Sequence, residues 1–303
     1  MRLDRLLIRL HPSLARRKAR EVIEKGQVTV DGELVREAGR DVGEEAKVVF
    51  DPNRRALRRV RSSLPLLYED EHLLVIDKPA GLLTVPTAPG ALEDTALGRV
   101  REYAHRLKPR GGFAERVHRL DRDTSGALAF ALSRAARASL IRTFREHRIQ
   151  RAYLVIVEGE PRADAGEIRA PLRDAWVSGR RAIARGDEVG IAARTSWRVI
   201  ERFEGGALLE VELATGRQHQ IRVHLAHVGL PVLGDPVYGR PSRGPSPARR
   251  PMLHAFRLAF DHPVSGARVA VESRPPEDFR RALEALRRGR AGIRSRPRPG
   301  SPP

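Results

Sequence analysis

The sequence contains no cysteine and no long hydrophobic run. The absence of cysteine excludes disulfide bonds, thiolate zinc sites, iron–sulfur ligation and cysteine nucleophiles. Because no stretch of about 18 apolar residues occurs, no membrane-spanning helix is expected. The first eighteen residues carry charges throughout and lack the apolar stretch of a signal peptide. We therefore expect a cytoplasmic protein.

Lysine is also scarce. The chain has 57 basic residues, of which only five are lysine, against 38 acidic residues, so its net charge is +19. Such an excess favours polyanionic partners, either nucleic acid or an anionic membrane surface. The preference for arginine fits recognition of phosphate by the guanidinium group, but it fits codon bias equally well.

The positive charge is concentrated in three segments. Residues 1–61 carry sixteen Lys or Arg against ten Asp or Glu, residues 240–250 carry four Arg and no acid, and residues 280–303 carry eight Arg and one Glu. The remainder of the chain is nearly balanced. Residues 289–303 are rich in Gly, Pro, Ser and Arg, so we predict a basic disordered tail there.

A length of 303 residues suggests two domains, and 41% hydrophobic residues are enough for a packed core. Residues 3–10 show the leucine spacing of a helix, and a second helix is expected between Ser13, as its N-cap, and Gly26. The Asp31-Gly32 pair between apolar residues predicts a β-hairpin, which residues 47–50 would extend with a third strand.

Four basic residues lie near the start of the second predicted helix: Arg16, Arg17, Lys18 and Arg20. They suit contact with phosphate groups. A charged helix face that is merely solvated is the alternative, and the pattern alone leaves both interpretations open.

The rest of the chain mixes apolar strands and amphipathic helices without a regular strand–helix–strand repeat or a Gly-x-Gly-x-x-Gly motif. This mixture favours an α+β fold over a doubly wound sheet. Strands are expected at 73–77, 127–132, 151–157, 207–213 and 253–260, and helices at 95–107, after Ser133, at 217–228 and at 277–288.

Residues 118–126, His-Arg-Leu-Asp-Arg-Asp-Thr-Ser-Gly, form a polar turn just before a buried strand. Loop residues held by a rigid strand are common sites of chemistry. The neighbouring arginines favour the ionised form of Asp121. Its carboxylate suits a nucleophile or a base, and it suits a structural salt bridge as well.

A second polar group lies on the predicted helix 217–228. Adjoining positions on this helix hold Gln218, Ile221, Arg222 and Leu225. Thr215-Gly216 would place backbone N–H groups at the N-terminus of the helix, where phosphate binds. This segment also holds three histidines. Their separations of five and three residues place only His224 and His227 on one face, and no His-Glu-x-x-His pattern occurs, so we expect no metal site.

Taken in order, these segments resemble known families. The first fifty residues, with Arg-Leu-Asp-Arg-Leu-Leu and the Val-x-Val-Asp-Gly hairpin, are similar to the S4-like RNA-binding domain. Residues 73–86, 118–126, 151–159, 215–225, 234–239 and 253–266 resemble the pseudouridine synthases of the RluA type, with His-Arg-Leu-Asp-Arg-Asp-Thr-Ser-Gly as the most specific segment.

The resemblance implies roles for individual residues. Asp121 would be the catalytic aspartate, Tyr153 the active-site tyrosine and Arg222 the basic residue paired with the aspartate. Without the resemblance, the position of Tyr153 in an apolar strand is typical of an ordinary core tyrosine. Arg119 would fill the place of the extruded base. The family usually has Lys where Arg151 stands and commonly Thr where Gln218 stands. The further RNA contacts implied are Arg16, Arg17, Lys18, Arg20, Lys78, Arg217, Gln218 and His219.

The resemblance also implies an activity and a domain plan. A small α/β RNA-binding domain (1–60) would precede a catalytic domain (64–288) with a mixed, largely antiparallel sheet and then the tail (289–303). The protein would be a monomer that isomerises uridine in large-subunit ribosomal RNA without cofactor or metal. The same activity on transfer RNA, and a non-catalytic RNA-binding or ribosome-assembly factor, are the alternatives.

Overall fold

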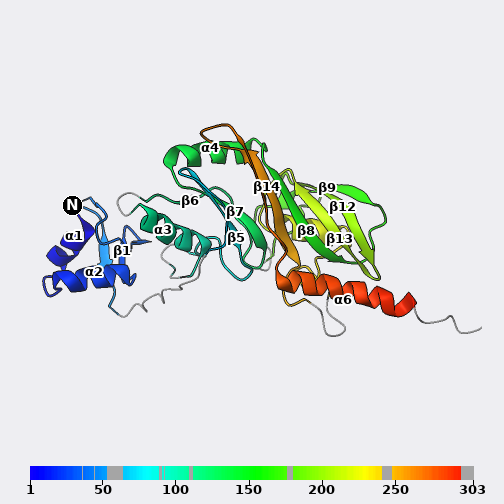
Figure 1. The fold of residues 1–303 in the computed structure, drawn as a ribbon, viewed down its shortest axis with the longest axis horizontal. Coiled ribbons are helices and arrows are strands. Elements are labelled where there is room, and N and C mark those ends of the chain that lie inside the picture. Colours follow the sequence, from blue (N-terminus) through cyan, green and yellow to red (C-terminus); the bar gives the residue numbers. More distant parts are fainter. Residues whose placement is uncertain are drawn as a thin grey trace, which may run out of the picture. The chain divides into compact units, whose positions relative to one another are not determined.

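The computed structural model of the chain describes residues 1–35, 37–43, 45–52, 64–88, 91, 93–108, 112–175, 180–240 and 248–294, without the side chains of residues 34 and 289–294. It forms two compact units (Figure 1). The first comprises residues 1–63 and 85–99, and the second comprises residues 64–84 and 100–303. Helix α3 (Ala96–Leu107) begins in the first unit and continues in the second.

The first unit has two helices and a small antiparallel sheet. The helices are α1 (Leu3–Leu10) and α2 (Arg16–Glu24), and the strands are β1 (Val28–Val30), β2 (Glu33–Leu34) and β3 (Val48–Phe50), in the order β2-β1-β3. Asp31 and Gly32 both have positive φ, 51° and 79°, as a two-residue type I′ hairpin requires. The predicted hairpin and third strand are therefore confirmed.

The start of the second helix differs from the prediction. Its N-cap is Ala15, and no side chain caps it. Ser13 lies two residues earlier in an exposed turn. The helix packs against α1 through Ala19, Val22 and Ile23, which are buried in one cluster with Leu3, Leu6 and Leu7. Apolar packing therefore sets the position of α2 without help from a capping serine.

The second unit is built on one sheet. In the described part of the chain, ten strands form it in the order β4-β5-β7-β14-β8-β13-β12-β9, with β15 on β14 and β6 on β7. They are β4 (Leu66–Glu69), β5 (Leu73–Lys78), β6 (Glu115–Arg116), β7 (Ser125–Ala131), β8 (Gln150–Glu158), β9 (Ala165–Arg169), β12 (Arg194–Phe203), β13 (Gly206–Leu213), β14 (Leu253–Asp261) and β15 (Arg268–Glu272).

Pairing in this sheet is antiparallel except between β7 and β14, which run parallel at Ser125–Gly126 and His254–Ala255. The strands β10 (Leu172–Arg173) and β11 (Gly190–Ile191) form a separate two-stranded antiparallel sheet. Helix α4 (Arg134–Arg145) is capped by Ser133, as predicted. The α+β fold with a largely antiparallel sheet is confirmed.

Helix α6 (Glu277–Arg294) packs along strands β8, β12 and β13 (Figure 1) through Phe279 and Ala282, which contact Ile156, Phe203 and Leu208. It continues six residues beyond the predicted end at 288, because Ala and Arg, both good helix formers, outnumber the two glycines there. The predicted tail therefore begins as helix. Its residues 295–303 lie outside the described residues, as do 241–247 of the basic loop.

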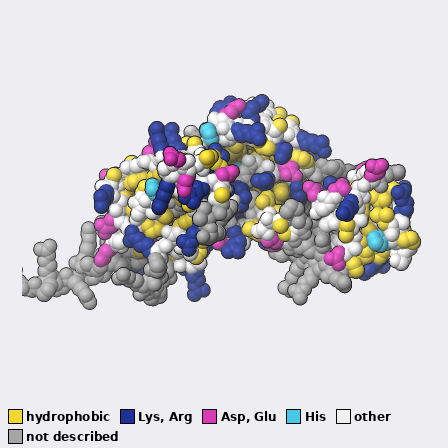
Figure 2. Space-filling model, turned by 180° about the vertical axis from the view of Figure 1, so that it is seen from behind, with side chains coloured by type: hydrophobic (Ala, Val, Ile, Leu, Met, Phe, Trp, Pro, Cys, Tyr) yellow, Lys and Arg dark blue, Asp and Glu magenta, His cyan; other side chains and the backbone are white. Residues whose placement is uncertain are grey.

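Basic and acidic side chains are interspersed over the visible surface (Figure 2). Among the described residues, no helix has both the length and the apolar character needed to cross a membrane.

Candidate active site

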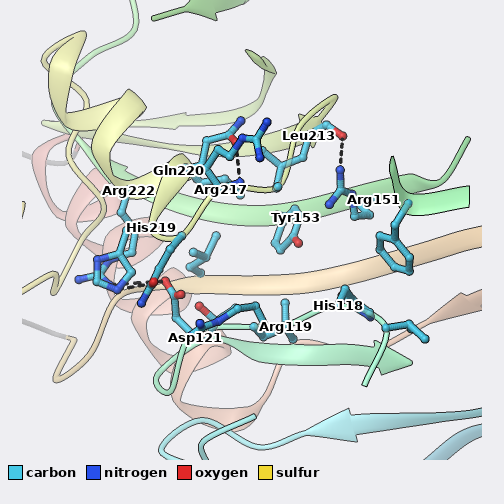
Figure 3. A pocket seen from close by; sticks show the side chains of 18 of the residues that line it. His118, Arg119, Asp121, Arg151, Tyr153, Leu213, Arg217, His219, Gln220 and Arg222 are labelled. Carbon is cyan, nitrogen blue, oxygen red and sulfur yellow. Dashed lines mark hydrogen bonds and ion pairs between the residues drawn. The ribbon is translucent and has the colours of Figure 1, made fainter. Parts of the chain in front are cut away.

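A cavity of about 470 Å³ opens in the second unit between the loop before β7, strand β8 and the segment that leads into α5 (Gln220–His227) (Figure 3). Among the described residues that line it, Asp121 supplies the only carboxylate, whereas six are arginines: Arg116, Arg119, Arg145, Arg151, Arg217 and Arg222. The cavity therefore gathers several positive charges around a single acid.

The loop that carries Asp121 is fixed by hydrogen bonds from three other segments. The Thr84 hydroxyl donates to the carbonyl of Leu120 (2.7 Å) and accepts from the N–H of the same residue (3.1 Å). The ammonium group of Lys78 donates to the Arg122 carbonyl (3.0 Å). Arg250 donates to the carbonyl of Asp123 (3.0 Å). Asp121 is thus held by its backbone neighbours, and its side chain is left to face the cavity.

Gly126 closes the same loop where β7 meets β14. Its φ is +114°, and a Cβ at this position would lie 2.2 Å from the carbonyl oxygen of Ala255. Only glycine allows the two parallel strands to approach this closely. Next to it, the hydroxyl of buried Ser125 lies 3.0 Å from Nδ1 of buried His254.

Tyr153 lies on β8 between the two ends of the cavity, with Asp121 on one side and Arg151 on the other (Figure 3). The tyrosine side chain is buried, and burial raises its pKa, so the phenol keeps its proton at neutral pH. The Arg151 guanidinium donates to the carbonyl of Leu213 (3.2 Å) and lies over the ring of Phe144. Among the described residues its Nε has no hydrogen-bond partner.

Arg222 joins Asp121 to a second aspartate. It donates two hydrogen bonds to Asp235, from Nε (2.6 Å) and Nη2 (2.7 Å), and places Nη1 at 3.5 Å from Oδ2 of Asp121. Burial would raise the pKa of Asp235, but the hydrogen bonds and charge of Arg222, together with the backbone N–H groups of Val237 and Tyr238, outweigh it and hold the pKa below the usual value. The sequence pointed to the Arg222–Asp121 pair, whereas the tighter pair is with Asp235.

Asp235 and Tyr238 were not singled out from the sequence. Both belong to the segment Gly-Asp-Pro-Val-Tyr-Gly at 234–239, whose resemblance to the family was the available signal. The ring of Tyr238 lies under the Arg222 guanidinium, 5.0 Å from its central carbon. Its hydroxyl lies 3.0 Å from Nδ1 of His219. The two residues thus hold Arg222 and His219 in place.

The predicted helix 217–228 is shorter than expected, because α5 begins only at Gln220. The Gln220 side-chain oxygen accepts from the Thr215 hydroxyl (2.8 Å) and the Arg217 N–H (2.9 Å), which holds residues 215–219 in a loop. Gln218 therefore does not share a helix face with Arg222, and Thr215-Gly216 is not at a helix N-terminus. His224 is buried and bonds Thr195 and the Ala170 carbonyl.

The other residues predicted to bind RNA fall into two groups. Arg119 and Arg217 are exposed at the cavity, and Gln218 and His219 line it in partly buried positions. Lys78 is fully buried, and its three donors bond the carbonyls of Pro79, Leu82 and Arg122, which is at odds with contact to RNA. Burial lowers its pKa to about 7.

The basic residues of α2 are exposed in the first unit. Arg16, Arg17 and Arg20 line a shallow hollow together with Glu21 and Glu24. Two of the predicted contacts are engaged locally: Arg20 lies 3.0 Å from Asp4, and Lys18 lies 3.3 Å from Glu21. Arg16 and Arg17 are thus the residues of this group most available to an external anion.

Comparison with known proteins gives concordant results. A model of the RNA pseudouridylate synthase family matches residues 72–227, and a model of the S4 domain matches residues 1–48. The chain is 37% identical over 311 residues to the Pseudomonas aeruginosa protein named ribosomal large subunit pseudouridine synthase D, which covers 95% of this chain and 93% of the relative.

A Nitrosomonas europaea protein of the same name is 38% identical over 300 residues, covering 95% of this chain and 85% of the relative. The solved structure of human RNA pseudouridylate synthase domain containing 1 superposes with a TM-score of 0.57 and 27% identity, over 78% of this chain and 97% of that chain. Fold, site and matches place the chain among the enzymes that modify RNA. It belongs to the RNA pseudouridylate synthase family and is an isomerase, as its sequence segments predicted.

Proposed function

We propose that the protein converts uridine to pseudouridine in large-subunit ribosomal RNA and that Asp121, Tyr153 and Arg222 carry out the reaction. The observation that carries the proposal is the single carboxylate of a basic cavity, with Arg222 at 3.5 Å and Tyr153 beside it. The names of the relatives in Pseudomonas aeruginosa and Nitrosomonas europaea support ribosomal RNA as the substrate.

The reaction breaks the bond from C1′ of the ribose to N1 of uracil and forms a bond from C1′ to C5. The proton on C5 is lost and N1 gains one, so the atoms balance without a co-reactant. An ionised Asp121 next to the ribose serves as nucleophile toward C1′ or as base toward a ribose proton. Arg222, with Nη1 at 3.5 Å from Oδ2, contacts this carboxylate and orients it. Tyr153, with its proton retained, offers a ring on which uracil stacks.

The target base must leave its stack to reach Asp121, which costs a few kcal/mol. Arg119, exposed beside Asp121 at the cavity, is placed to fill the position that the base vacates and to offset part of this cost. Arg217 and Gln218 line the same cavity and complete the proposed contacts with the flipped nucleotide.

The domain plan is proposed on the same grounds. Residues 1–60 would dock the RNA through Arg16, Arg17, Lys18 and Arg20, residues 64–288 would carry the catalysis, and residues 289–303 would add non-specific contacts to phosphate. The S4 match over residues 1–48 supports the first part. The expected partner is RNA, with the protein acting as a cytoplasmic monomer.

The proposed roles are tested with Asp121→Asn. We expect this variant to bind RNA as tightly as the wild type but to form no pseudouridine in single-turnover assays. Asp123→Asn is the matched control, because it neutralises a carboxylate two residues away that does not line the cavity. Full turnover by purified Asp121→Asn would refute the assignment of Asp121 as the catalytic aspartate.

The substrate is tested separately by mapping pseudouridine in total RNA from cells with and without the gene. Loss at sites in large-subunit ribosomal RNA is expected. Loss of pseudouridine only from transfer RNA would identify transfer RNA as the substrate instead. If no pseudouridine is lost anywhere, the protein only binds RNA.

A further inference from the structure

His219 lies beside Asp121 at one end of the cavity (Figure 3). Its Nε2 lies 3.9 Å from Oδ2 of Asp121, and its Nδ1 lies 3.0 Å from the hydroxyl of Tyr238. The two rings meet edge to face, with centroids 5.7 Å apart. The imidazole therefore connects a structural tyrosine to the carboxylate on which the proposed reaction depends.

The surroundings of Tyr238 favour one tautomer of the His219 ring. The backbone N–H of Arg181 donates to the Tyr238 hydroxyl oxygen at 2.9 Å. Burial raises the pKa of Tyr238, so the hydroxyl keeps its own proton and has it available to donate to Nδ1 of His219, 3.0 Å away. A neutral imidazole that accepts at Nδ1 must carry its proton at Nε2, which is the nitrogen that faces Asp121.

The ring stays neutral at physiological pH. Burial is the largest influence on His219 and lowers its pKa. Asp121 and Asp235 oppose this effect, whereas Arg222 and Arg119 add to it. A neutral Nε2–H can hold a carboxylate oxygen without neutralising the carboxylate.

The backbone at His219 supports a functional role. The residue has φ 58° and ψ 14°, the left-handed region, as the N-cap of α5. Residues other than glycine and asparagine adopt this conformation at a cost of about 1 kcal/mol or more, and such strain gathers at functional sites. Asparagine would relieve the strain and glycine would remove it, yet the position holds a histidine whose ring reaches the cavity.

Two donors approach the same oxygen of Asp121. Nη1 of Arg222 lies 3.5 Å from Oδ2, and Nε2 of His219 lies 3.9 Å from it. No described side chain bonds Oδ1. The 3.9 Å gap exceeds hydrogen-bonding distance, and catalytic hydrogen bonds are commonly long before substrate binds and shorten in the complex.

We propose that His219 is a positioning residue, oriented by Tyr238, which together with Arg222 holds Oδ2 of Asp121 so that Oδ1 faces the ribose. The proposal rests on the proposed role of Asp121. It gives His219 a role through the carboxylate, where the sequence indicated direct contact with RNA.

Two substitutions at position 219 distinguish the role of Nδ1 from the role of Nε2. The amide of His219→Asn reaches only as far as Nδ1, so it keeps a partner for Tyr238 but loses the donor to Asp121. The amide of His219→Gln reaches as far as Nε2 and keeps that donor. Asparagine also accepts the left-handed backbone, so His219→Asn is expected to fold at least as well as the wild type.

The measurement is the single-turnover rate of pseudouridine formation at saturating RNA, together with the Kd for the same RNA. We expect His219→Asn to slow the rate about tenfold, equivalent to about 1.4 kcal/mol, with the Kd unchanged. His219→Gln should recover most of the rate, and Tyr238→Phe should slow it about threefold. His227→Asn, an exposed histidine at the end of the same helix, is the matched control and should equal the wild type.

A weaker Kd with an unchanged saturated rate in His219→Asn would overturn the proposal in favour of an RNA contact. Equal rates in His219→Asn and His219→Gln would overturn it as well, as would a Tyr238→Phe enzyme that matches the wild type. Asp121→Asn is assayed in parallel. If that variant remains fully active, the proposed function itself fails, and this result is distinguishable from a failure at His219 alone.

Discussion

Removal of the negative charge of Asp235 should destabilise the protein far more than removal of an ordinary surface charge. The Asp235 side chain is fully buried, and Arg222, its partner, is 8% exposed. Asp235→Asn keeps the size of the side chain but leaves the guanidinium charge buried without its main counter-charge. Breaking a buried ion pair in this way costs about 3–5 kcal/mol.

The effect should reach the active site, because Arg222 lies close to a second carboxylate. Freed from Asp235, its guanidinium has Asp121 as the nearest anion, already 3.5 Å away. A bidentate pair between Arg222 and Asp121 would occupy both carboxylate oxygens. We therefore expect Asp235→Asn to lower the rate of pseudouridine formation as well as the stability, although Asp235 does not line the cavity.

The assay is urea unfolding followed by circular dichroism, with single-turnover rates measured on the same samples. Asp164→Asn is the matched control. Asp164 is 91% exposed and pairs with Arg202, so its loss should cost less than about 1 kcal/mol and leave the rate unchanged. If Asp235→Asn stays within about 1 kcal/mol of the wild type, the buried pair is not the support that its geometry indicates.

Three further predictions concern the loop before β7, the pH dependence of stability and the first unit. Gly126→Ala should unfold at lower urea concentration and lose activity, because its Cβ would meet the Ala255 carbonyl at 2.2 Å. Burial lowers the pKa of His118 to about 3, so only the unfolded ring gains a proton below about pH 6.5, and stability should fall by up to about 1.4 kcal/mol per unit as the pH drops further. Arg16→Gln combined with Arg17→Gln should weaken the salt dependence of RNA binding. The slope of the logarithm of the binding constant against the logarithm of the salt concentration should fall in magnitude by about 0.7–0.9 for each phosphate group that the variant no longer neutralises.

Each of these has its own control. Gly266→Ala also places alanine at positive φ, +71°, but in open space, so it should cost only about 1 kcal/mol. His118→Asn should flatten the pH dependence between about pH 6.5 and 5, and equal slopes would contradict the burial argument. Arg5→Gln with Arg9→Gln removes two exposed charges from α1 and should change the salt slope less than the α2 pair does.

Local signals in the sequence predicted much of the fold. The Asp31-Gly32 turn and the cap at Ser133 depend on residues adjacent in the chain, and both are found where the sequence places them. The longest described strand of the sheet, β12, was not predicted, since only two of its ten residues are buried and its apolar pattern is weak. The start of α5 was also misplaced, because a side chain within the helix, Gln220, holds the preceding loop.

The residues of the site were likewise predictable only in part. The turn that carries Asp121 was recognisable as a motif, and Tyr153 and Arg222 lie beside the same cavity. The partnership of Arg222 with Asp235 could not be read from spacing, because thirteen residues and a turn separate them. For Lys78 the resemblance implied an RNA contact, and only the fold shows that its ammonium group bonds backbone carbonyls.

The place of β14 in the sheet has a consequence for synthesis of the chain. This strand lies between β7 and β8, yet it follows them in sequence by more than ninety residues. Until residue 261 has left the ribosome, the nascent protein holds two half-sheets with unpaired inner edges, a state prone to misassembly. Gly126 meets Ala255 only when β14 inserts, so the loop of Asp121 gains its final support late. A truncated chain that ends before β14 would contain every proposed catalytic residue and still lack an assembled active site.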